Sequence, residues 1–75
     1  MIPYGNLSGV SGIQAFESGR DYIIVQFKTH GTYRYDHECP GPRHVKRMIE
    51  LALRGDGLGT YINKHVRNSY AVKLR

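Results

Sequence analysis

The chain has 75 residues, a single cysteine, and eleven Lys and Arg against six Asp and Glu, for a formal net charge of +5. This length indicates one domain. One cysteine cannot form the disulfide framework on which small secreted proteins depend. No apolar run approaches the length of a membrane span, and the N-terminal residues lack the basic and apolar regions of a signal peptide. We therefore expect a cytoplasmic protein that does not contact membranes.

The N-terminal part of the chain predicts a loose start. Residues 1–10 are rich in Gly, Ser and Asn and are expected to form a lead-in, with room for a short extended piece around residues 2–7. No linker, repeat or low-complexity tract divides the rest. Residues 11–75 are therefore expected to form the single domain.

Two strands are predicted next. Residues 13–16 suit a short strand, and residues 17–21 suit a turn in which Gly19 takes a positive φ. Residues 22–28 are mostly β-branched or aromatic, which predicts the central strand of a sheet. One face of this strand is wholly apolar and is assigned to the core: Ile23, Val25 and Phe27.

Residues 32–37 predict the return strand of a hairpin, and the length of the loop decides where its tyrosines point. A two-residue loop would place Tyr33 and Tyr35 on the outer face of the sheet. A three-residue loop that ends at Gly31 would place both tyrosines on the core face, opposite Phe27 and Val25. The absence of an Asn-Gly or Asp-Gly pair favours the three-residue loop.

An amphipathic helix is predicted over residues 43–54. Pro42 suits its first position, and Gly55 suits the left-handed conformation that ends many helices. Its apolar stripe comprises Val45, Met48, Ile49, Ala52 and Leu53.

The C-terminal part predicts a second helix over residues 60–67, with Asp56 or Thr60 as its cap. Its inner line comprises Leu58, Ile62 and Val66. Residues 70–75 alternate in polarity and suit an extended edge segment. The expected fold is α+β: a small antiparallel three-stranded sheet, then two helices packed on one face, then an extended C-terminal tail.

Four segments carry a resemblance to a known family: residues 11–16, the motif Tyr33-Arg34-Tyr35, residues 59–67, and the tail built on Tyr70. In this order they resemble the KTSC domain, a short module named for its occurrence at the C-terminus of some lysyl-tRNA synthetases. The module also occurs as a stand-alone bacterial or phage protein. The similarity runs from about Ser11 to Leu74. The resemblance defines no activity, and it implies RNA binding only through the company of a tRNA synthetase.

A basic surface with interleaved aromatic residues is typical of nucleic-acid binding. Phosphate contacts need flexible cations without strict spacing, so cations from both helices and the tail could follow a nucleic-acid backbone. On the outer sheet face, Tyr33 and Tyr35 could stack on splayed bases, whereas on the core face they would pack under the helices. The candidate residues are Lys28, Tyr33, Arg34, Tyr35, Arg43, Lys46, Arg47, Lys64, Arg67, Lys73 and Arg75.

The composition is also compatible with functions other than RNA binding. The same basic surface could bind an acidic protein. A small ribonuclease would need a base and a cation, such as His65 with Arg67 or His44 with Arg34, but no spacing selects either pair.

A metal site has weaker support still. His37, Cys39 and His44 lie close in sequence, with His30 or His65 as a fourth ligand, yet they lack the paired spacing of zinc sites. The sequence thus predicts a monomeric, non-catalytic module without metal or cofactor. Its expected partner is RNA or another nucleic acid, or alternatively an acidic protein.

Overall fold

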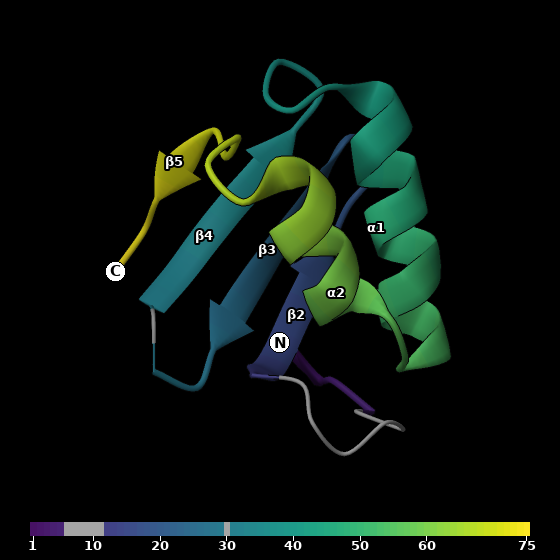
Figure 1. Cartoon of the computed structure of the whole chain (residues 1–75), viewed down its shortest axis with the longest axis vertical. Coiled ribbons are helices and arrows are strands. Elements are labelled where there is room, and N and C mark those ends of the chain that lie inside the picture. Colours follow the sequence, from purple (N-terminus) through teal and green to yellow (C-terminus); the bar gives the residue numbers. More distant parts are fainter. Residues whose placement is uncertain (6–11, 30) are drawn as a thin grey trace.

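The computed structural model describes residues 1–5, 12–29 and 31–75. Residues 6–11 and His30 lie outside these ranges. The expectations that concern them are part of the lead-in, the start of the family resemblance at residue 11, and the roles considered for His30. Within the described ranges, five strands form one antiparallel sheet in chain order: β1 (Ile2–Pro3), β2 (Ile13–Ser18), β3 (Tyr22–Phe27), β4 (Gly31–Asp36) and β5 (Val72–Lys73). Helices α1 (Pro42–Arg54) and α2 (Leu58–Tyr61) lie on one face of this sheet (Figure 1). Helix α2 continues directly into a π-helical turn, η1 (Ile62–Val66).

The fold is α+β, but the expected count of three strands is wrong. Strand β1 pairs with β2, where Ile2 lies opposite Phe16, and β5 pairs with β4, where Lys73 lies opposite Tyr33. Both additional strands have two residues and lie at the edges of the sheet. The sequence indicated extended chain around residues 2–7 and over residues 70–75, but no local pattern shows that such a short segment pairs with a neighbouring strand.

The hairpin of β3 and β4 places its tyrosines on the core face, as the three-residue loop predicted. Their partners, however, are shifted by one pair: Tyr33 lies opposite Val25, and Tyr35 lies opposite Ile23. The shift arises because Gly31 does not belong to the loop. It is the first residue of β4, opposite Phe27, with a φ of 101°.

Helix α1 begins at Pro42 and ends before Gly55, whose φ is 75°, in agreement with the prediction. Its apolar stripe differs from the prediction at one position, because Leu51 is buried and Leu53 is 68% exposed. Leu51 lies three residues after Met48 and shares its face of the helix, whereas Leu53 is turned toward solvent.

The N-terminal segment takes part in the core. Tyr4 is only 6% exposed, and its hydroxyl oxygen accepts a hydrogen bond of 3.1 Å from the backbone N–H of Leu58. This contact caps α2, and neither Asp56 nor Thr60 provides the side-chain cap that was expected. The inner line of this helical segment is as predicted, because Leu58, Ile62 and Val66 are all buried. No helix in the described ranges is long and apolar enough to cross a membrane.

The turn before β3 depends on a glycine for a reason other than the expected one. Gly19 is not among the described glycines with positive φ. A Cβ atom at this position would instead collide with the ring of Tyr22. The glycine therefore leaves space for an aromatic ring.

Candidate nucleic-acid interface

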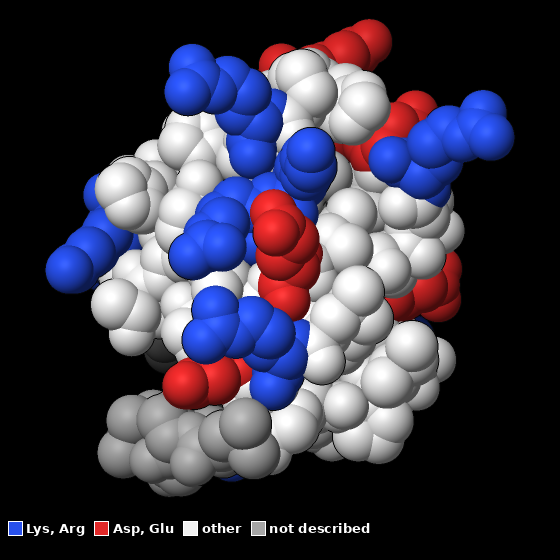
Figure 2. Space-filling model, turned by 90° about the vertical axis from the view of Figure 1, so that its right-hand side faces the viewer, with Lys and Arg blue, Asp and Glu red and all other residues white. Residues whose placement is uncertain are grey.

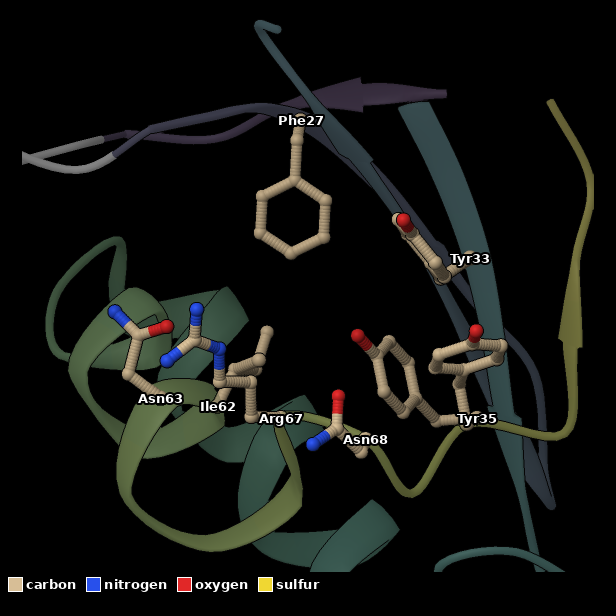
Figure 3. Close-up of a pocket in the computed structure, with 8 residues that line it drawn as sticks. Phe27, Tyr33, Tyr35, Ile62, Asn63, Arg67 and Asn68 are labelled. Carbon is tan, nitrogen blue, oxygen red and sulfur yellow. The ribbon is translucent and has the colours of Figure 1, made fainter. Parts of the chain in front are cut away.

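An open cleft of about 280 Å³ lies between the sheet and the helical segment that follows α2. In Figure 3, Phe27 and Tyr33 project from the sheet on one side, and Arg67 and Asn68 lie on the other. The cleft is thus built from residues far apart in the chain. Its lining comprises Phe27, Tyr33, Tyr35, Ile62, Asn63, Arg67, Asn68 and Tyr70.

The wall on the sheet side is an aromatic cluster centred on Tyr33. The Tyr33 ring meets Phe27 edge to face, with 5.8 Å between centroids, and meets Tyr70 in the same manner at 4.7 Å. The Lys73 ammonium lies 5.7 Å from the Tyr33 ring centroid, within the range of a cation–π contact. These contacts hold the ring in place while leaving it only half-buried.

The opposite wall is polar. Asn63, Arg67 and Asn68 are exposed, and the buried Ile62 closes the bottom of the cleft between them. Among the described residues, Arg67 makes no ion pair, so its guanidinium is available to an anion. Ile62 and Asn63 belong to the π-helical turn, which ends just before Arg67 and is a rare element that often occurs at functional sites.

Tyr35 lies at the base of the cleft and belongs to the core, because it is 1% exposed. Burial raises the pKa of its hydroxyl, and the charges that Tyr33 and Tyr70 would carry when ionised raise it further. Tyr35 therefore remains a neutral phenol and has no free ring face for stacking. Of the two predicted stacking residues, only Tyr33 is accessible.

Arg34 points to the opposite face of the sheet. Its Nε donates a hydrogen bond of 3.3 Å to Asp36, and its guanidinium lies 4.4 Å from the centroid of the Tyr22 ring. Asp36 also accepts hydrogen bonds from the backbone N–H groups of Glu38 and Cys39, at 3.0 and 3.1 Å. Desolvation raises the pKa of the Asp36 carboxyl, but these N–H groups and Arg34 lower it more, so the net pKa is below its ordinary value. Arg34 thus organises the turn before α1 and does not line the cleft.

The cations of α1 form a separate surface. Arg43, Lys46 and Arg47 are exposed, and the acidic Glu50 lies on the same helix. Figure 2 shows this side of the molecule, where basic side chains gather around an acidic one. Because opposite charges are interspersed, this face is less strongly cationic than its Lys and Arg content suggests.

The remaining predicted cations are divided between two faces. Lys64 is exposed on η1, and Lys73 lies over Tyr33 at the cleft. Lys28 is exposed just after β3. Arg75 lines a shallow hollow on the outer face of the sheet together with Ile24. The structure therefore brings Tyr33, Tyr35 and Arg67 to the cleft, with Lys73 beside it at the Tyr33 ring, but not the other candidates.

A second cluster joins the two helices. Nδ1 of His44 lies 2.7 Å from the hydroxyl of Tyr61, and the rings of Tyr61 and His65 have centroids 4.6 Å apart. The ring centroids of His44 and His65 are 6.2 Å apart. The pairs considered from the sequence were different: His65 with Arg67, and His44 with Arg34. The only sequence signal for this cluster was the spacing of Tyr61 and His65 by four residues, which places both on one flank of a helix.

Beside this cluster lies an open pocket of about 530 Å³. Its lining combines a backbone turn with three polar side chains: Pro40, Gly41, Pro42, Arg43, His44 and Tyr61. Within the described ranges, no three His, Cys, Asp or Glu side chains converge as metal ligands. No protein-family model, curated protein or solved structure matches the chain.

Proposed function

We propose that this protein is a small, non-catalytic module that binds single-stranded RNA, acting as a monomer in the cytoplasm. The observation that carries the proposal is the cleft, where the half-buried ring of Tyr33 and the exposed guanidinium of Arg67, which pairs with no acidic group among the described residues, lie on opposite sides. An accessible aromatic ring opposite a free cation provides for both parts of a nucleotide, the base and the phosphate.

The chemistry of the aromatic wall suits an unpaired base. Stacking between a base and an aromatic side chain contributes about 1–3 kcal/mol and tolerates any sequence, because every base has a π face. Tyr33 and Tyr70 are only partly buried where they line the cleft, and Phe27 meets Tyr33 edge to face beside them. The cleft volume of about 280 Å³ is near the lower end of typical ligand pockets. It therefore fits one base better than a base pair.

The polar wall suits the rest of the nucleotide. The planar guanidinium of Arg67 matches the geometry of a phosphate and can donate two parallel hydrogen bonds to it. The amides of Asn63 and Asn68 supply both donors and acceptors, which can contact a base edge or a ribose 2′-hydroxyl. The 2′-hydroxyl is the group that distinguishes RNA from DNA, and the resemblance to the KTSC domain also favours RNA.

One observation favours a second candidate, an acidic protein bound to α1. Leu53 is 68% exposed on this helix, and Lys46 lies two turns before it on the same face. An exposed leucine beside cations is suited to a protein surface with apolar and acidic groups, whereas it contributes nothing to phosphate binding. This candidate involves a face of the molecule other than the cleft, so variants can separate the two.

The test is the binding of a fluorescently labelled, unstructured RNA of about twelve nucleotides, measured by polarisation at several salt concentrations. Binding should weaken steeply with salt, because phosphate contacts release counterions. Arg67→Ala should weaken it by about tenfold, the loss expected for a charge-assisted hydrogen bond. Arg20→Ala is the matched control, since it removes the same charge from an exposed turn outside the cleft.

Three results would contradict the proposal. The first is no binding at low salt, and the second is equal effects of Arg67→Ala and Arg20→Ala. The third is preference for duplex RNA over the single strand. Equal binding of single-stranded DNA with the same sequence would remove the assignment to RNA in particular. Capture of a single acidic protein that Leu53→Ser abolishes would favour the second candidate.

A further inference from the structure

The helical segment formed by α2 and η1 presents polar side chains on two opposite flanks. On one flank, Asn63 lines the aromatic cleft, together with Arg67 just beyond η1. On the other flank, Tyr61 and His65 contact His44 of α1. The buried inner line of Leu58, Ile62 and Val66 holds the segment against the core between these flanks.

Lys64 lies on the crest between the two flanks. It is exposed and lies midway along the turn between the buried Ile62 and Val66, so it is on the side of the turn away from the inner line. Its ammonium therefore projects into solvent where a ligand would pass from one flank to the other. Cations thus occur on the cleft side, on the crest and on the α1 side, at Arg67, Lys64 and Arg43.

The pocket on the α1 side has the chemistry of an anion site. Its polar side chains are the guanidinium of Arg43, the imidazole of His44 and the phenol of Tyr61, and no acidic residue lines the described part of it. The close contact of 2.7 Å between His44 Nδ1 and the Tyr61 hydroxyl fixes both rings. Nε2 of His44 is left as the ring nitrogen that can contact a ligand. The Arg43 guanidinium can donate two hydrogen bonds to one phosphate, and the pair of His44 and Tyr61 can add one more, because a neutral imidazole and the phenol use one of their two protons in the contact between them.

We infer that a single strand of RNA crosses the helical segment, with a base in the aromatic cleft, its backbone over Lys64, and a further phosphate in the pocket of Arg43, His44 and Tyr61. This inference rests on the proposed function and specifies the course of the RNA. A helix with its side chains is about 10–12 Å wide. At the spacing of a strand in a duplex, about 3.4 Å per nucleotide, that width corresponds to roughly three nucleotides, and an extended strand crosses it with fewer. The minimal ligand is therefore a short oligonucleotide rather than a mononucleotide.

The experiment compares the binding of oligouridines of one, two, four and eight nucleotides to the full chain, by calorimetry for the longer ligands and NMR titration for the shorter ones. For the wild-type protein, affinity should rise sharply between two and four nucleotides. Arg43→Ala should remove most of this rise and weaken the octamer by about fivefold to tenfold, as expected for one exposed phosphate contact. Arg67→Ala should weaken every length.

The control is Lys46→Ala, which removes one charge from the same helix. Lys46 lines a different hollow, with Arg20 and Ile49, on another side of α1. This substitution should change octamer binding by less than about twofold, the size of a general charge effect. Arg43 is exposed, so its truncation should leave the fold intact. Tyr61→Phe keeps the ring, removes the hydroxyl, and should reproduce part of the Arg43→Ala effect.

The outcomes separate this inference from the proposed function. If no length of RNA binds, the proposed function fails. If Arg67→Ala weakens binding while Arg43→Ala and Lys46→Ala have equal effects, RNA binding stands and the crossing path is wrong. The path is also wrong if the mononucleotide binds as tightly as the tetramer. The His44 ring resonances should shift with the tetramer and not with the mononucleotide, and the reverse pattern would overturn the inference.

Discussion

Replacing Tyr4 with phenylalanine tests whether the N-terminal segment holds the binding helix in place. The Tyr4 hydroxyl is the partner of the Leu58 N–H at the start of α2, at 3.1 Å. Both residues are buried, at 6% and 0% exposure, so water cannot replace the lost oxygen without rearrangement. Phenylalanine keeps the ring and its packing. The substitution therefore isolates one hydrogen bond and leaves a buried donor without a partner.

The expected loss is about 1–3 kcal/mol in the free energy of unfolding, the cost of an unsatisfied buried polar group. For a domain of 60–100 residues, each kcal/mol lowers Tm by about 4–8 °C. Urea denaturation followed by circular dichroism should show a lower midpoint with an unchanged m-value, since the surface exposed on unfolding is the same.

The matched control is Tyr22→Phe. The Tyr22 hydroxyl donates to Glu17 at 3.3 Å in an exposed contact, so its removal should change stability by less than about 0.5 kcal/mol. The reasoning would be refuted if Tyr4→Phe were as stable as the wild-type protein, or no less stable than Tyr22→Phe. It would also be refuted if the m-value fell, because the change would then concern more than one hydrogen bond.

Three further substitutions test other parts of the fold. Gly55→Ala should cost at least about 1 kcal/mol of stability in urea denaturation, because φ is 75° and the new Cβ would lie 3.1 Å from the Cα of Gly5. Gly12→Ala, whose Cβ would have no described atom within 4 Å, should be nearly neutral. The lowered pKa of Asp36 means that its ionised carboxylate stabilises the fold. This contribution is complete at pH values above the unfolded-state pKa of about 3.9 and is lost as pH falls through the folded-state pKa. Asp36→Asn should therefore lose less stability than the wild-type protein between neutral pH and acid. The raised pKa of Tyr35 gives stability the opposite dependence on pH. Its stabilising contribution is complete below the unfolded-state pKa of about 10 and is lost as pH rises beyond that value. Tyr35→Phe should retain more of its stability in alkaline denaturation, and equal losses would contradict the assignment.

The elements that could be predicted from the sequence are those defined by local periodicity. Residues 22–28 alternate, and they correctly indicated the core face of β3. Both helix ends at Pro42 and Gly55 also follow from local backbone preferences. The choice between Leu51 and Leu53 could not be made locally, because either leucine extends a plausible apolar stripe. Packing against the sheet selects the one that faces it.

The features missed in the sequence depend on contacts between distant residues. The cap of α2 joins residues 54 positions apart, and the pair of His44 and Tyr61 joins residues 17 positions apart. No pattern within a short window connects such pairs. Extended chain was expected around residues 2–7 and over residues 70–75, but its pairing with β2 and β4, which makes β1 and β5 strands of the sheet, depends on such distant contacts as well. Tyr33 and Tyr35 were also predicted as an equivalent pair, but their burial separates them into a site residue and a core residue.

The inner line of Leu58, Ile62 and Val66 explains why the candidate binding surface is located at this helical segment. Three buried side chains on one line hold the segment against the core, with Tyr61 packed at its side, and leave Asn63, Lys64 and His65 exposed. The segment lies between two partners, since its flanks meet the aromatic wall of the sheet on one side and His44 of α1 on the other. A short helix held in this way can therefore present two different polar surfaces without loss of core packing. Substitutions on its flanks should consequently alter ligand binding far more than stability, whereas substitutions on its inner line should do the reverse.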